Sequence, residues 1–221
     1  MSCPVKKSDK GEPYIPLILP SHPDDDIRLT PWKEDDLDDI IELFNLPNVE
    51  KWGRSRPSPF TQSHAAELIP EIQSHLPFLL SLVSSHPNPP DLSTYPKQRV
   101  RLSPLGALRD THGKIIGTLG FKTPSEPGSG GEWEVTYNLH DGYAGRGIGG
   151  AMVRVAVQWG RWLRIRRLIA HTEADNFASN RVLSKNGFFI RSERAVEWPE
   201  HRGGGRRDTY EWYRALDNPD P

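Results

Sequence analysis

The stretch Tyr143-Ala144-Gly145-Arg146-Gly147-Ile148-Gly149-Gly150 guides the interpretation of the whole chain. It places four glycines within residues 145–150, directly before an amphipathic pattern that predicts a helix to about Leu163. Glycines let backbone amides approach an anion closely, and the amino end of a helix carries a partial positive charge. The stretch therefore predicts a site for a phosphate or a pyrophosphate.

Two kinds of phosphate ligand remain open on these residues. A Walker A loop is excluded because no Gly-Lys-Ser/Thr is present. Gly145, Gly147 and Gly150 spell the dinucleotide pattern G-x-G-x-x-G, and Glu173 stands where a ribose-binding acid would lie. Against an NAD(P)-binding domain, the turn follows a predicted antiparallel hairpin, and only 48 residues follow Glu173, too few for the usual parallel sheet.

The glycine turn also resembles the coenzyme A motif of the GNAT superfamily of N-acetyltransferases, R/Q-x-x-G-x-G/A, with Gly147 and Gly149 as its glycines. Downstream, the segment from Asn176 to Phe188 is similar to the family's N-x-x-S-x-x-V-L-x-K-x-G-F. Upstream, Glu134-Val135-Thr136-Tyr137 resembles the family's E-[IL]-G-Y strand, and Arg207-Asp208 resembles the start of its last strand. Motifs in this order are far more specific than any one alone, and the RimJ/RimL-like branch is the most similar.

This resemblance implies an α/β fold with a mixed, mostly antiparallel, V-splayed sheet flanked by helices, and acetyl-CoA as co-substrate. It also implies the residues that bind the cofactor. The amides of the turn would hold the pyrophosphate, and the segment after the next strand would line the pantetheine arm. The predicted cofactor-binding residues are Gly145, Arg146, Gly147, Ile148, Gly149, Gly150, Asn176 and Asn180.

Acetyl transfer to an amine needs a base for the amine, a donor for the thioester oxygen and a donor for the leaving sulfur. By resemblance, a backbone N–H of the strand 133–139 polarises the thioester. Glu134 is the candidate base, acting through water, and its structural alternative is an exposed strand glutamate. Ser179 is the candidate donor to the sulfur, and its alternative is a helix cap. Transfer is expected to be direct, without an acyl-enzyme.

Two positions depart from the family pattern. Ala144 occupies the first R/Q position of the turn, and Leu183 stands where many members carry a tyrosine that acts as general acid. These departures leave the acid unassigned and keep a non-enzyme alternative, a degenerate GNAT domain that binds acyl-CoA as a sensor or scaffold.

The composition limits the partners of the protein. The 221 residues carry a net charge of -1, so no global field favours nucleic acid or an anionic membrane. The single cysteine, Cys3, allows no intrachain disulfide, and the eight histidines form no metal-ligand pattern. We expect a cytoplasmic protein, with the nucleus as a second location, that acts without metal as a monomer or homodimer. The expected acceptor is a small amine or a peptide or protein amine.

Proline marks the domain organisation. Six of the 21 prolines fall at or before Pro31 and seven between Pro70 and Pro104. Residues 1–24 are expected to be an unstructured arm, and residues 25–217 a single GNAT domain with a proline-rich insertion at about 84–104.

Within the domain, the patterns predict a short strand at 27–29, a helix capped by Thr30-Pro31, and a helix from about 61 to 69 that Pro70 breaks or kinks. A hairpin, a strand and the glycine turn with its helix come next. A strand, a short helix and two closing strands complete the chain. The predicted ranges of these later elements are 105–109, 115–122, 133–139, 167–172, 178–185, 188–196 and 209–215. The order predicts a mixed sheet with one parallel crossover.

Overall fold

The computed structural model describes residues 3–84, 103–122 and 132–216. The expected proline-rich insertion at about 84–104 therefore lies almost entirely outside the described residues. The described strands are β1 (Lys6–Lys7), β2 (Pro13–Pro16), β3 (Arg28–Thr30), β4 (Ala107–Arg109), β5 (Ile115–Lys122), β6 (Glu132–Leu139), β7 (Arg167–Glu173), β8 (Phe189–Glu197) and β9 (Arg206–Ala215). The described α-helices are α1 (Leu37–Asn45), α2 (Pro47–Glu50), α3 (Gln62–Gln73), α4 (Leu76–Ser84), α5 (Ile148–Trp162) and α6 (Phe177–Lys185).

These strands form one sheet in the order β1-β2-β3-β4-β5-β6-β7-β9-β8. Among the described strands, β6 and β7 are the one parallel pair, joined by α5, and the other neighbours are antiparallel. The predicted mixed, mostly antiparallel α/β fold with a single parallel crossover is confirmed.

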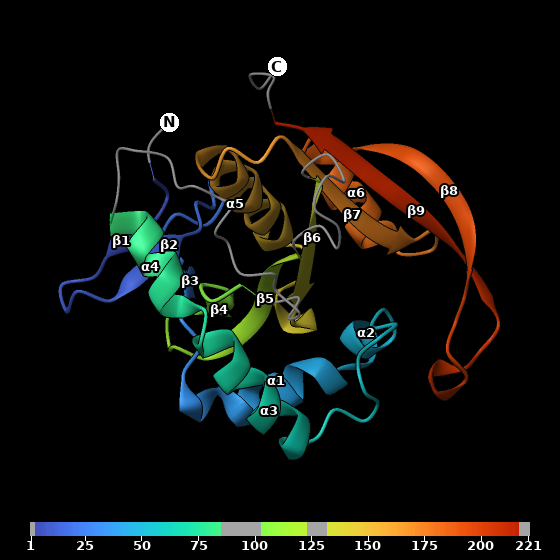
Figure 1. Cartoon of the computed structure of the whole chain (residues 1–221), viewed down its shortest axis with the longest axis horizontal. Coiled ribbons are helices and arrows are strands. Elements are labelled where there is room, and N and C mark those ends of the chain that lie inside the picture. The colour runs from blue at the N-terminus through green and yellow to red at the C-terminus, as the bar shows by residue number, and fades with distance from the viewer. Residues whose placement is uncertain (1–2, 85–102, 123–131, 217–221) are drawn as a thin grey trace.

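Helices cover both faces of the sheet (Figure 1). Strand side chains alternate between faces, so neighbouring residues of one strand belong to different layers. Leu108 and Ile116 belong to the hydrophobic cluster that contains α5, whereas Ala107 and Ile115 belong to the cluster of α1 and α3. The apolar runs of β4 and β5 are therefore explained by burial on both faces.

The parallel pair diverges soon after it begins. β6 and β7 are in register only from Glu132 opposite Arg167 to Glu134 opposite Ile169. Beyond that point β6 continues to pair with β5, and β7 with β9. The sheet therefore splits into a V between the carboxyl-terminal halves of β6 and β7, and the glycine turn follows β6 at the open end of the V.

The amino-terminal segment corrects the expectation of an unstructured arm at 1–24. β2 pairs with β3, and the side chains of Ile15, Leu17 and Leu19 are buried in the cluster beneath α5. Pro13 and Pro16 bound the four residues of β2, where a strand can accommodate them. Apolar burial thus outweighs the local proline signal.

Two predictions in the amino-terminal half were also wrong, namely the end of a helix at about residue 69, where Pro70 would break it, and the helix cap at Thr30-Pro31. α3 runs through Pro70 to Gln73, because Ile69 and Ile72 on either side of the proline are both buried at helical spacing. Thr30-Pro31 does not cap a helix. Instead, a short 3-10 helix, η1 (Glu34–Asp36), begins after Lys33, whose backbone N–H donates to Asp36 Oδ2 at 2.6 Å.

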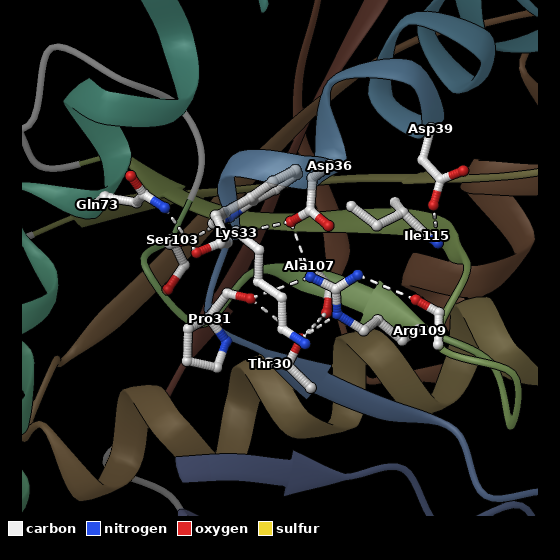
Figure 2. Close-up of polar contacts among 12 residues, drawn as sticks. Thr30, Pro31, Lys33, Asp36, Asp39, Gln73, Ser103, Ala107, Arg109 and Ile115 are labelled. Atoms are coloured by element: carbon white, nitrogen blue, oxygen red, sulfur yellow. Dashed lines mark hydrogen bonds and ion pairs between the residues drawn. The ribbon is translucent and has the colours of Figure 1, made fainter. Parts of the chain in front are cut away.

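A buried ion pair joins η1 to β4 (Figure 2). Arg109 Nη2 donates to Asp36 Oδ2 at 2.8 Å, and both side chains are almost completely buried. The other guanidinium nitrogens of Arg109 donate to Thr30 Oγ1 at 2.8 Å and to the Gly113 carbonyl at 3.0 Å. Burial raises the pKa of Asp36, which the Lys33 amide and Arg109 oppose. Every charged group of this cluster thus has partners within the protein.

The described helices include none that is long and apolar enough to cross a membrane.

Candidate active site

The split between β6 and β7 opens into a cavity of about 840 Å³. Its walls come from both diverging strands, from the start of α6, from the loop after α2 and from the β8–β9 hairpin. Its lining residues include Arg54, Lys122, Glu134, Tyr137, His171, Glu173, Asn176, Ser179, Leu183 and Trp198.

Glu134, the predicted base, lines this cavity. It is the last residue of β6 that pairs with β7. Its Oε1 lies 3.3 Å from His171 Nδ1 and its Oε2 lies 3.5 Å from Lys122 Nζ. His171 Nε2 lies 3.4 Å from Glu211 Oε2, so the imidazole sits between two carboxylates. Glu134 is therefore not the exposed strand glutamate of the structural alternative, because its side chain is only 15% exposed and is held from two sides.

Ser179 faces Tyr137 across the V. The Tyr137 hydroxyl lies 2.6 Å from Ser179 Oγ, and it also approaches the Ser179 carbonyl at 3.4 Å. Burial raises the pKa of Tyr137 to about 12, so its hydroxyl keeps its proton across the physiological range. Leu183, one turn further along α6, is fully buried. The position that many family members fill with tyrosine therefore supplies packing here, and a tyrosine from β6 approaches the same helix.

The two asparagines of the segment 176–188 fix the start of α6. Asn176 is the N-cap of the helix, and its Oδ1 accepts from the Ser179 amide at 3.2 Å. Ser179 is thus not the cap, so its structural alternative was wrong. Asn180 Nδ2 donates to the carbonyls of Ala174 at 3.0 Å and Glu173 at 3.4 Å, and Asn180 Oδ1 accepts from Thr172 Oγ1 at 2.5 Å. Asn180 thereby ties α6 to the end of β7.

The glycine turn has the open geometry that an anion site requires. Gly145 and Gly147 have φ values of 78° and 79°, a left-handed conformation that glycine adopts without strain. A Cβ at either position would meet no atom within 4 Å. Gly147 is the N-cap of α5, and this residue makes no side-chain cap hydrogen bond. The N-cap residue thus leaves the first amides of α5 without a side-chain cap of its own, and the space beside Gly145 and Gly147 is open.

The remaining residues of the turn contribute differently. The Ile148 side chain is fully buried in the core, so only its amide can face a ligand. Gly149 lies against Val182 of α6, which a Cβ would approach at 3.5 Å. Arg146 forms an ion pair with Asp25 and lies over the Tyr143 ring at 5.3 Å. Its guanidinium is thus held by the amino-terminal segment, and a phosphate would have to compete with Asp25 for it.

Two residues of the cavity wall were not among the predicted acetyltransferase site residues, although Glu173 was the candidate ribose-binding acid of the dinucleotide alternative. Glu173, the last residue of β7, is only 7% exposed, and within the described residues no cationic side chain forms an ion pair with it. Burial raises the pKa of its carboxyl, an effect that its own backbone N–H and the more distant charges of Arg207 and Lys51 oppose. Trp198 is 3% exposed, and its indole N–H has no hydrogen-bond partner in the described part of the chain. Only the strand-end position of Glu173 could have signalled a role from sequence.

The β8–β9 hairpin extends toward the side of the molecule where α2 lies (Figure 1), and its residues line the cavity. Arg54, in the loop after α2, donates to the Glu197 carbonyl at 3.0 Å, and Arg202 in the hairpin tip donates to the Glu50 carbonyl. Arg207 donates to the Lys51 carbonyl at 3.2 Å and lies 3.8 Å from the centre of the Trp198 ring. Segments about 150 residues apart in the chain thus form one wall.

The described residues contain no group of three or more histidines, cysteines and carboxylates that could hold a metal ion. His140 approaches Glu42 at 3.5 Å, and His171 has the carboxylate neighbours given above.

The fold, the V-shaped split and the glycine turn agree with a comparison of the sequence to known families. The family described as "Acetyltransferase (GNAT) domain" matches residues 26–189, which is most of the chain. The protein therefore belongs to the GNAT acetyltransferase family. The sheet also argues against the NAD(P)-binding alternative, because its described strands include a single parallel pair instead of a parallel βαβαβ unit.

Solved structures of acetyltransferases share this fold at low sequence identity. One is the ribosomal-protein-S5-alanine acetyltransferase from Vibrio fischeri, with a TM-score of 0.62 at 20% identity over 88% of this chain and 96% of that chain. Another is a putative phosphinothricin N-acetyltransferase, with a TM-score of 0.60 at 18% identity over 88% and 99%. A third is spermidine N-acetyltransferase from Vibrio cholerae in complex with CoA and spermine, with a TM-score of 0.60 at 15% identity over 87% and 96%. A search of curated proteins gave no match.

Proposed function

We propose that this protein is an acetyl-CoA-dependent N-acetyltransferase that moves the acetyl group directly to a primary amine of a small molecule, peptide or protein. The observation that carries the proposal is the combination of an uncapped glycine turn with a lined cavity at the split between β6 and β7. The spermidine acetyltransferase of similar fold was solved with CoA, which supports a donor of this class. The segment Asn176–Phe188 supports a place near the RimJ/RimL-like branch.

The residues present fit coenzyme A. The open space beside Gly145 and Gly147 leaves room for a pyrophosphate against the amides of residues 145–150. Asn176 stands at the start of α6, on the cavity wall, where a pantetheine amide would contact it. When bound, the coenzyme supplies an activated acetyl thioester. We assign Asn180 to positioning α6, because both of its amide hydrogens have carbonyl partners in the protein.

The roles in the reaction follow from the same arrangement. Glu134 takes, through a water molecule, the proton that the acceptor nitrogen loses as its bond to the acetyl carbon forms. A backbone N–H of β6 donates to the thioester oxygen, where negative charge develops. Ser179 Oγ donates to the sulfur as the carbon–sulfur bond breaks, and Tyr137 holds Ser179 in place. Lys122 and His171 orient the Glu134 carboxylate.

Purified protein mixed with acetyl-CoA and a panel of primary amines tests the proposal, with release of free thiol as the readout. Glu134→Gln should lower kcat by about a hundredfold or more, the typical contribution of a general base, with little change in acetyl-CoA affinity. Glu132→Gln is the matched control, since Glu132 lies two residues away on the same strand and pairs with Arg191.

Thiol release that is equal in the two variants would place the base elsewhere. Tight acetyl-CoA binding without turnover on any amine would overturn the enzymatic proposal and favour an acyl-CoA sensor.

A further inference from the structure

Glu173 is a buried carboxylate that the proposed reaction does not use. It lies at the end of β7, where the V is open, and it lines the same cavity as Glu134. Its neighbour Thr172 points to the other face of the strand, where it contacts Asn180 of α6, whereas His171 faces Glu134. Because side chains alternate along a strand, Glu173 shares the face of His171, away from α6.

The charged groups around Glu173 do not neutralise it by contact. Arg207 and Lys51 attract it from a distance, and Asp175 repels it. Lys51 itself pairs with Asp175 at 3.4 Å, and Arg207 donates to backbone carbonyls and stacks on Trp198. A buried carboxylate without a contacting cation is costly, and buried charges in proteins are ordinarily paired.

Trp198 gives this end of the cavity a buried polar group that has no hydrogen-bond partner among the described residues. Its indole N–H, like the Glu173 carboxylate, belongs to the cavity wall, and Arg207 interacts with both residues. An unpartnered indole N–H and a carboxylate that no cation contacts, in one wall, are what a polar ligand would complete.

We propose that Glu173 binds a second positive charge on the acceptor, so that the preferred acceptor is a diamine or another amine with a distant cationic group. This inference rests on the proposed function, because it assigns the acceptor class of that site. Glu134 is level with Ile169 on β7, and Glu173 lies four residues further along. At roughly 3.3 Å per residue these strand positions are about 13 Å apart, but the Glu134 carboxylate reaches His171, two residues before Glu173, so the two carboxylates stand about 7 Å apart along the strand. One end of such an acceptor reaches the reaction centre while the other meets Glu173.

Matched acceptors test this. With wild-type protein, α,ω-diaminooctane should have a kcat/KM at least about tenfold above that of octylamine, since a hydrogen bond to a charged group contributes about 1.5–3 kcal/mol. Glu173→Gln should remove most of this preference while leaving the octylamine value nearly unchanged. Ethylenediamine, too short to span the two carboxylates, should gain nothing over ethylamine.

Asp175→Asn is the control, since it removes an acid two residues away that does not line the cavity. It should leave the preference intact. A preference for the diamine that persists in Glu173→Gln, or equal rates for both amines in the wild type, would overturn the inference.

A binding measurement keeps this result separate from the proposed reaction. If neither amine is acetylated, the proposed function fails, and calorimetry of α,ω-diaminooctane on the coenzyme A-saturated protein decides the inference. Binding to wild type that Glu173→Gln weakens about tenfold or more supports it, and equal or undetectable binding to both overturns it. An unchanged melting temperature and acetyl-CoA affinity would show that the variant is folded.

Discussion

Asp36 and Glu173 are both buried carboxylates with raised pKa values, but their surroundings are opposite. Asp36 is 2% exposed and meets Arg109 at 2.8 Å within a cluster of side chains and backbone groups (Figure 2). Glu173 is 7% exposed and has no contacting cation among the described residues. A buried charge that the protein satisfies by itself serves the fold. A buried charge that the protein leaves unsatisfied in a cavity wall indicates where a ligand completes the structure.

The largest expected effect is on stability, when the buried ion pair of Asp36 and Arg109 is broken. Arg109→Met leaves Asp36 buried with only the Lys33 amide as a partner. Removing one member of a buried ion pair costs about 3–5 kcal/mol, so the free energy of unfolding should fall by that amount. Lys114→Met is the matched control, because its pair with Glu42 is close to half exposed and should contribute about 1 kcal/mol or less. Chemical denaturation measures both, and equal losses would contradict the assignment.

The glycines give the same contrast between fold and ligand. Gly147→Asp places a negative charge beside the predicted pyrophosphate and should weaken acetyl-CoA binding by up to about 4 kcal/mol, the interaction of two unit charges 4 Å apart at an effective dielectric constant of 20. Gly147→Asn is the neutral control, since asparagine also tolerates the left-handed conformation.

Gly106→Ala should show the reverse behaviour, because its Cβ would meet the Leu119 carbonyl at 2.2 Å. It should lower stability. Calorimetry and thermal melts separate the two effects. If the Asp and Asn variants bind acetyl-CoA equally, the turn does not face the phosphates.

Ligand-induced stabilisation identifies which ligand binds at the glycine turn and the cavity. A ligand at 100 times its dissociation constant stabilises the native state by about 2.7 kcal/mol. For a domain of this size each kcal/mol shifts the melting temperature by roughly 2–4 °C, so acetyl-CoA should raise it by about 5–10 °C. NAD and NADP should have almost no effect, and desulfo-CoA should act nearly as well as CoA. A shift with NAD but not with acetyl-CoA would restore the dinucleotide interpretation of Gly145, Gly147 and Gly150.

The sequence predicted the β6–α5–β7 unit because its signals are local. A glycine cluster before an apolar periodic run determines a turn and a helix whatever lies elsewhere. The motif segment Asn176–Phe188 likewise begins at a helix cap and ends just past the helix. By contrast, Pro13 and Pro70 do not determine the local structure, since burial of Ile15, Ile69 and Ile72 outweighs the local preference of proline.

The unforeseen parts of the site are contacts between distant segments. Tyr137 meets Ser179 across the V, and the hairpin near Trp198 joins the loop at Arg54. The importance of Glu173 depends on the absence of a contacting cation, which no sequence pattern expresses. Asp36 suited the amino end of a helix by position alone, and its pairing with Arg109 required the fold.

Tyr137 and Ser179 provide a third case, because their hydroxyls form a hydrogen bond with each other at the cavity wall. Their variants test whether the two hydroxyls act together in catalysis. Ser179→Ala should lower kcat about tenfold, the equivalent of one hydrogen bond of about 1.4 kcal/mol, with the KM for acetyl-CoA nearly unchanged. Tyr137→Phe should have a similar effect, and the double variant should be no worse than either single one, because Tyr137 acts through Ser179. Additive losses in steady-state kinetics would show that the two hydroxyls act independently.

The smallest expected effect returns to Glu173 and concerns stability without ligand. Burial raises the folded-state pKa of its carboxyl above the unfolded value. Such a group contributes stability that is fully present below the unfolded pKa and is lost as the pH rises through the folded pKa. Glu173→Gln removes this loss without leaving a buried charged partner unpaired. The variant should therefore be more stable than wild type near pH 7, by about 0.5–2 kcal/mol, the range common for single stabilising substitutions.

The advantage should shrink as the pH falls toward the unfolded carboxyl pKa, where the wild-type side chain is also neutral. Asp36→Asn should instead be less stable than wild type near pH 7, although the pKa of Asp36 is also raised. The substitution leaves the buried Arg109 guanidinium without its carboxylate partner. Denaturation curves of the two variants from pH 4 to pH 8 measure both signs. A Glu173→Gln variant that is less stable than wild type near pH 7 would mean that the protein itself satisfies this carboxylate, and the contrast between the two buried acids would not hold.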